Sequence, residues 1–282
     1  MRSDPQLTTG ALPALLGVLC AWGVLRLWQA VYAELHCLLL LPLIGVVALL
    51  IAASTLEGAL LRRRAWLRSY LRGESWLFSL LRGGALLLTW HLLKGLLLAL
   101  VLLLGVLRWP THYWLLLLAD ALLLWLAVQG LSRWLPSHVR PGFAPILARQ
   151  WLVLVNTLLC GGALLALAYY SPLPDLRGSG LLAGIEAEVA TIQLACPELA
   201  LLVRLDSALH HTGWWLVQSG LSHPALLFIA PLAWLFFLAL YLAFLWIYSR
   251  MLLGAMLSPE NLLHWLAQDT PAPFAARGSR DE

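Results

Sequence analysis

The sequence contains few charged residues. Only 11% of its 282 residues are Asp, Glu, Lys or Arg, whereas 61% are hydrophobic, and the mean hydropathy is +0.83. In a soluble domain about a quarter of the residues are charged. This composition excludes a soluble globular protein, and we expect an integral membrane protein.

The sequence also lacks the short motifs that identify common catalytic, nucleotide and metal sites. It has no Cys-x-x-Cys or His-Glu-x-x-His pair, no phosphate-binding loop and no nucleophile elbow. We therefore predict a protein that is not an enzyme and carries no cofactor. The net charge of +4 arises beside the apolar segments, which favours contact with anionic lipid headgroups over contact with nucleic acid. Lys94 is the only lysine among 18 basic residues, which we interpret as the mark of a GC-rich bacterial genome.

Six apolar segments approach the length of about 20 residues that a helical membrane span requires. They cover residues 11–33, 37–54, 85–107, 113–131, 150–170 and 224–248. The predicted fold class is an all-α integral membrane protein, a six-span helical bundle. We divide the chain into a first membrane hairpin (1–54), an arginine-rich amphipathic helix (55–84), a second membrane hairpin (85–132), a basic loop (133–149), the fifth span (150–170), an extracytoplasmic helical region (171–223), the sixth span (224–250) and a tail (251–282).

Charge is distributed unequally between the connections. Residues 54–85 carry six arginines against two acids, residues 133–149 carry three arginines and no acid, and residues 171–223 carry five acids against two arginines. Because basic connections stay on the cytoplasmic side, both termini are predicted to be cytoplasmic and residues 171–223 to face outward. The predicted location is the bacterial inner membrane. Helical periodicity at 181–192 and after Pro197 predicts two amphipathic helices that lie against the outer membrane face or form a small outer cap on the bundle.

The arginine-rich stretch between the second and third spans has two faces. Basic and hydroxyl side chains recur at helical spacing on one face and apolar side chains on the other, which predicts a helix lying in the inner lipid surface. The arginines predicted to bind anionic lipid are Arg62, Arg63, Arg64, Arg68, Arg72 and Arg82.

Four ionisable residues lie inside predicted spans, where they are functional candidates by default. Arg26 and Asp120 each lie about seven residues from the outer end of their span, at equal depth, which predicts an ion pair. Such a pair would either fix the packing of the two helices or relay a proton or ion. Alternatively, the Arg26 side chain extends to the membrane interface and has no partner. Lys94 lies one turn from His91. Its stem can reach the inner headgroups, or the two residues can belong to a transport path.

Cysteine and histidine are the remaining candidates. Cys37 and Cys196 both fall on the predicted outer side, where an oxidising periplasm permits a disulfide. His36, His210 and His211 fall on the same side, where imidazoles can assemble a metal site or lie scattered at the interface.

Small residues four positions apart allow close helix packing, within the chain or between copies. The pairs are Gly17 with Ala21, Gly95 with Ala99, and Gly162 with Ala166.

Three functions are compatible with these features. The first is a non-catalytic subunit that packs against other membrane proteins, or against itself, in a secretion, transport or energy-transducing complex. The second is a small transporter or ion channel that uses Arg26, Asp120, Lys94 and His91. The third is an extracytoplasmic metal-handling protein. The first is preferred because catalytic motifs are missing and the spans contain few polar residues.

Overall fold

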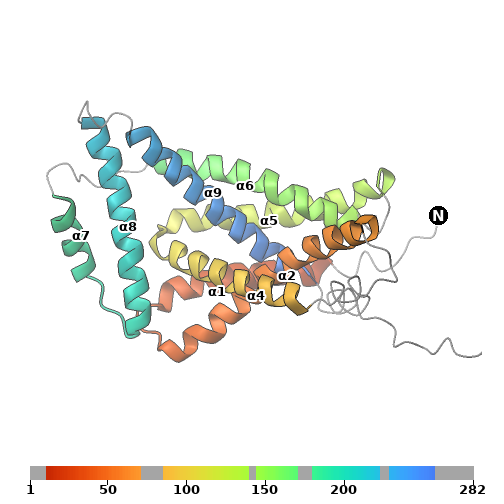
Figure 1. The fold of residues 1–282 in the computed structure, drawn as a ribbon, viewed down its shortest axis with the longest axis horizontal. Coiled ribbons are helices and arrows are strands. Elements are labelled where there is room, and N and C mark those ends of the chain that lie inside the picture. The colour runs from red at the N-terminus through yellow and green to blue at the C-terminus, as the bar shows by residue number, and fades with distance from the viewer. Residues whose placement is uncertain (1–10, 71–84, 140–143, 171–179, 223–228, 258–282) are drawn as a thin grey trace, which may run out of the picture.

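The computed structural model describes residues 11–70, 85–139, 144–170, 180–222 and 229–257, and all regular structure in these ranges is helical. Figure 1 shows the arrangement of the elements. The helices are α1 (Ala11–Val31), α2 (Cys37–Tyr70), α4 (Ala85–Gly105), α5 (Thr111–Trp134), α6 (Ala144–Tyr170), α7 (Leu181–Ala190), α8 (Pro197–Ser222) and α9 (Ile229–Ala255), with 3₁₀ turns η2 (Val106–Arg108) and η3 (Leu135–Ser137).

Six of these helices are long and apolar enough to cross a membrane. The candidate spans are Ala11–Val31, Cys37–Leu60, Leu87–Gly105, Thr111–Ser137, Ile146–Leu167 and Trp234–Ala255. Helices α7 and α8 are not among them. The prediction of an all-helical fold with six helices long and apolar enough to span a membrane is confirmed for the described residues.

The end of the second span differs from the expectation. Instead of stopping at residue 54 before a separate arginine-rich helix, α2 continues without a break to Tyr70. Its polar side chains are satisfied there, because the Thr55 hydroxyl donates to carbonyl oxygens of the preceding turn and Glu57 is paired with Arg149. The stretch 62–70 therefore continues α2 beyond the span that ends at Leu60, which corrects the predicted helix boundary at residue 54. Residues 71–84, with Arg72 and Arg82, lie outside the described residues, as do the side chains of Arg63, Arg64 and Arg68.

Two other predicted boundaries differ from the structure, because the helices beside them are longer than expected. The predicted loop 133–149 is helical at both ends, because α5 and η3 extend to Ser137 and α6 already begins at Ala144. The last helix continues to Ala255 rather than ending near residue 248, since its final turns are buried against other helices. The tail from residue 258 lies outside the described part of the chain.

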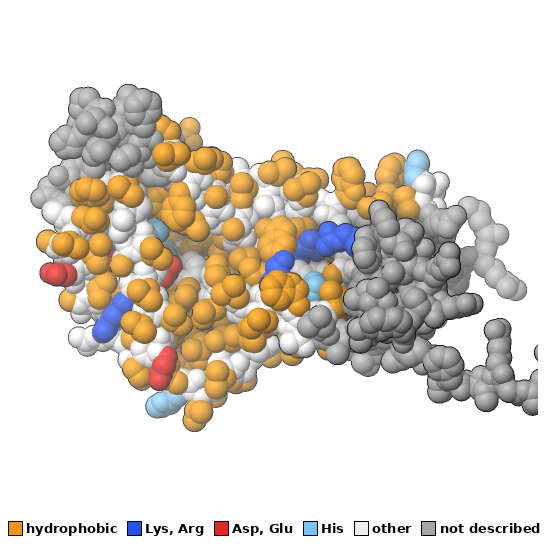
Figure 2. Space-filling model, in the orientation of Figure 1, with side chains coloured by type: hydrophobic (Ala, Val, Ile, Leu, Met, Phe, Trp, Pro, Cys, Tyr) orange, Lys and Arg blue, Asp and Glu red, His pale blue; other side chains and the backbone are white. Residues whose placement is uncertain are grey.

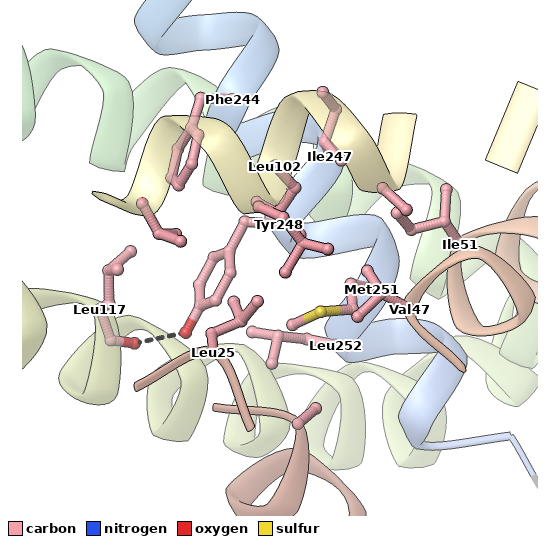
Figure 3. Close-up of a cluster of buried hydrophobic side chains, with 14 of the residues drawn as sticks. Leu25, Val47, Ile51, Leu102, Leu117, Phe244, Ile247, Tyr248, Met251 and Leu252 are labelled. Carbon is pink, nitrogen blue, oxygen red and sulfur yellow. Dashed lines mark hydrogen bonds between the residues drawn. The ribbon is translucent and has the colours of Figure 1, made fainter. Parts of the chain in front are cut away.

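Helix α9 occupies the centre of the bundle. Half of the residues in its span are buried, against 22–33% in the other five spans. It packs against α1, α2, α4, α5, α6 and α8, and Figure 1 shows it crossing the bundle diagonally. Its side chains meet those of four other helices in the core drawn in Figure 3, where the Tyr248 hydroxyl donates to the Leu117 carbonyl oxygen at 2.9 Å. The middle of the bundle is thus filled by an apolar helix.

Glycines let the backbones approach closely around α9. A Cβ atom on Gly254 would overlap the carbonyl group of Leu50 on α2, and one on Gly17 of α1 would overlap the Ala255 carbonyl oxygen. Of the three small-residue positions predicted from spacing, Gly17 and Gly95 lie at helix contacts. Gly162 has open space beside it, and its neighbour Gly161 packs on Leu242 instead, so the third pair makes no close helix contact within the chain, and its packing between copies stays a prediction.

Helices α7 and α8 lie across one end of the bundle in Figure 1. We call this the disulfide end, because the Cys37–Cys196 bond joins α8 to the start of α2 there. The amide of Ala195 also donates to the Ala33 carbonyl oxygen. We call the opposite end, which holds Glu57, Arg62 and Arg149, the arginine end.

Candidate functional site

One cluster of polar side chains inside the bundle lies between α5, α6 and α9. Asp120, only 2% exposed, accepts a hydrogen bond from the Cys160 thiol at 2.7 Å and from the Asn156 amide at 3.3 Å. The same amide donates to the hydroxyl of the fully buried Ser249 at 3.0 Å. Three spans are joined by this cluster, and both carboxylate oxygens of Asp120 have a donor.

The structure does not bring Arg26 and Asp120 together. The Arg26 guanidinium donates to Gln29 Oε1 at 2.6 Å and lies over the Trp114 ring, 5.5 Å from its centre. Trp114 precedes Asp120 by six residues, which is about 9 Å along a helix axis. The predicted ion pair is therefore corrected: equal depth did not place the two side chains on facing surfaces.

Gln29 is a site residue that sequence reasoning missed. Its amide nitrogen donates to the carbonyl oxygens of Val106 at 3.0 Å and Trp109 at 2.7 Å, while its oxygen accepts from Arg26 and from Trp114 Nε1. It thereby satisfies the backbone where α4 ends and the chain turns into α5. The sequence feature that could have identified Gln29 is its position one helical turn after Arg26, an arginine inside a predicted span.

A second polar group lies at the arginine end. Glu57 of α2 accepts two hydrogen bonds from Arg149 of α6, one of them 3.0 Å long from Nε. Next to this pair, Arg250 of α9 donates to Gln150 Oε1 at 2.7 Å. Sequence reasoning assigned Glu57 and Arg149 to connections, so it did not consider them as partners.

Lys94 and His91 have different neighbours. Lys94 is exposed, and its Nζ lies 5.4 Å from the centre of the Trp246 ring. His91 is buried and its Nδ1 donates to the Leu87 carbonyl oxygen of its own helix at 2.8 Å. The structure therefore does not combine these two residues into one site.

At the disulfide end, Cys37 and Cys196 are joined, with their Cα atoms 5.1 Å apart. Glu198 Oε2 lies 2.9 Å from Cys37 Sγ and 3.4 Å from Cys196 Sγ. These three residues form the one set of metal-ligand type found in the part of the chain that the structure describes. Both sulfurs are used by the disulfide, which leaves a single carboxylate and no metal centre in this state.

The three histidines predicted as metal candidates are separated. His211 Nδ1 lies 2.9 Å from Glu188 Oε2, whereas His210 Nε2 accepts from Trp214 Nε1 at 2.9 Å. Adjacent residues on a helix point about 100° apart, which explains their different partners. His36 lies exposed in the α1–α2 connection. The structure does not bring these residues into one ligand set.

One surface at the disulfide end is unusually apolar for a helix outside the candidate spans. Leu201, Leu205 and Leu209 of α8 follow one another at four-residue spacing and are 60%, 54% and 69% exposed. We call them the leucine row. Beside it, a cavity of about 500 Å³ is lined by Gln193, Leu194, Ala195, Pro197, Ala200 and Arg204.

Comparisons of the chain with protein-family models, with curated proteins and with solved structures each find no match. The function is therefore argued from the fold and from these clusters.

Proposed function

We propose that this protein is a non-catalytic, multi-pass membrane protein that serves as an accessory subunit of a larger membrane assembly, such as a secretion, transport or energy-transducing complex. The observation that carries the proposal is the leucine row of α8. Large exposed apolar side chains are ordinary on a span, where lipid covers them, but α8 is not a candidate span. A continuous apolar row outside the hydrocarbon region is typical of a surface that another protein covers.

The way in which α8 is held supports this proposal. The opposite face of the helix is buried against the rest of the protein through Leu199, Ser207, His211 and Trp214. The disulfide fixes the start of α8. A rigid helix loses little conformational entropy when a partner binds its free face, which favours binding.

The orientation belongs to the proposal as well. The arginine asymmetry favours cytoplasmic termini in a bacterial inner membrane, with α7 and α8 forming an outer cap. Disulfides persist outside the cytoplasm, and the Cys37–Cys196 bond lies at the end that this rule assigns to the exterior. The leucine row would then meet its partner, or a second copy of this chain, on the extracytoplasmic side.

Site-specific photo-crosslinking in intact cells tests the proposal. A photoreactive residue replacing Leu205 should give one discrete crosslinked polypeptide, and the added Leu205→Glu charge should abolish copurification of that polypeptide. Leu123, 63% exposed on the α5 span, is the matched control and should give lipid adducts only. The proposal fails if position 205 also gives lipid alone, or if the purified protein reconstituted by itself moves a solute or dissipates an ion gradient.

A second candidate, a small transporter or ion channel, is favoured by one observation. Asp120 is a buried carboxylate inside a span, a position where ionisable groups often mark ion or proton paths. A path through one protomer is opposed by α9, which fills the bundle centre. If Asp120 carries flux in reconstituted vesicles, Asp120→Asn should abolish the flux while folded protein is still recovered. A structural role predicts loss of folded protein instead.

A further inference from the structure

We propose that the arginine end holds a binding site for the phosphate group of an anionic phospholipid, on the membrane-facing surface between α4, α9 and α2. Lys94, Arg250 and Arg62 supply the positive charge, and Lys94 and Arg250 both lie against the Trp246 ring. The site is independent of the function proposed above.

The geometry brings cations from separate helices around one indole. Lys94 Nζ lies 5.4 Å and Arg250 Cζ 5.3 Å from the centre of the Trp246 ring. Arg62 is exposed on α2, the helix that packs against both α4 and α9. Figure 2 shows basic side chains gathered in a row on a face that is otherwise largely apolar.

Among the residues that the structure describes, these charges have no carboxylate partner. Glu57 is the nearby acid, and Arg149 occupies both of its oxygens. Within the described ranges, no carboxylate oxygen lies within 4 Å of Lys94, Arg62 or Arg250. The Nε of Arg250 is buried and has no hydrogen-bond acceptor there. Cations that lack a carboxylate partner at the edge of a hydrocarbon layer are costly, so the arrangement favours a bound anion.

The depth of the cluster identifies the anion. Lys94 lies seven residues inside the span Leu87–Gly105, about 10 Å from its end, and a lysine stem can carry the charge toward the headgroup layer. Arg250 lies five residues before the end of the last span, and Arg62 lies two residues beyond Leu60. Lipid phosphate is the anion that is concentrated at this level. Guanidinium groups bind phosphate through two parallel hydrogen bonds, and indole rings favour the same interface.

The test compares retention of two lipids by the full-length protein. Wild type is reconstituted in nanodiscs of phosphatidylcholine and phosphatidylglycerol, and retained lipid is counted by native mass spectrometry after release. We expect preferential retention of phosphatidylglycerol. The double variant Lys94→Gln/Arg62→Gln should lose this preference by about fivefold for each base removed. Both side chains are exposed, so the variant should unfold at the wild-type temperature.

Arg133→Gln is the matched control, because Arg133 is an exposed base in the last turn of α5 outside the cluster. It should retain phosphatidylglycerol like wild type. The proposal is overturned if the double variant keeps the wild-type preference, or if wild type retains both lipids equally. It is also overturned if inorganic phosphate added to the nanodiscs displaces the lipid, because the site would then be one for free phosphate.

Discussion

The approach of α9 to α2 at Gly254 makes a quantitative prediction. A Cβ atom added at this position would lie within 2.9 Å of the carbonyl oxygen, the carbonyl carbon and the Cα of Leu50. These are backbone atoms, so no side-chain rotation can relieve the overlap. The two helices would have to separate, and the packing of Met251, Leu252 and Leu253, each at most 1% exposed, would loosen.

Two opposing contributions to the free energy of unfolding determine how much Gly254→Ala destabilises the protein. Overpacking of a core costs about 1–3 kcal/mol, and the upper part of that range applies because the neighbour is backbone. Alanine recovers up to about 1 kcal/mol of helix propensity relative to glycine. The net loss expected for Gly254→Ala is therefore about 2 kcal/mol. In a chain of this size that corresponds to a melting temperature about 4–8 °C lower.

The matched control is Gly130→Ala on α5, where an added Cβ would meet no atom within 4 Å. Only the propensity gain applies there, so the melting temperature should stay constant or rise. Both variants are compared with wild type by thermal unfolding in the same detergent. Equal shifts for the two variants would show that α9 and α2 do not approach closely at Gly254.

Three further variants test individual contacts. Cys37→Ser should cost about 2–4 kcal/mol and make the melting temperature insensitive to reductant, whereas an unchanged reductant effect would contradict the disulfide. Glu57→Gln leaves Arg149 without its carboxylate and should cost about 3 kcal/mol, and adding Arg149→Gln should restore part of this loss; additive losses would disprove the pairing. Tyr248→Phe removes one buried hydrogen bond to the Leu117 carbonyl and should lower stability by about 1 kcal/mol, so wild-type stability would argue against that bond.

The six spans could be predicted because their signal is local. Apolar length decides whether a segment can cross a membrane, whatever it packs against. The ends of the spans depend on partners elsewhere in the chain. Glu57 appeared in the sequence as part of a charged connection, and its pairing with Arg149, ninety-two residues later, keeps it within a continuous helix.

Side-chain partners were harder to predict, because the sequence gives depth but not direction around the helix axis. Arg26 and Asp120 lie at similar predicted depth, yet Arg26 donates a hydrogen bond to Gln29, whereas Asp120 accepts one from Asn156 of α6. The same limit applies to glycine. Gly161 and Gly162 are equivalent in a spacing pattern, but one step along a helix rotates the side chain by about 100°, and only Gly161 meets another helix. Cys37 and Cys196 were expected on one side from charge topology, and the structure joins them.

Helix α9 connects all the features on which the proposals rest. Phe237 near its start stacks on Trp214 of α8, Ser249 completes the Asp120 cluster, and Arg250 belongs to the proposed phosphate site. The leucine row and the lipid site therefore both lie on elements that pack against α9. A loosened α9 should therefore disturb both ends at once, while loss of the disulfide should act at α8 alone. Gly254→Ala should accordingly reduce phosphatidylglycerol retention as well as partner crosslinking from position 205, and Cys37→Ser should reduce the crosslinking but leave the lipid in place.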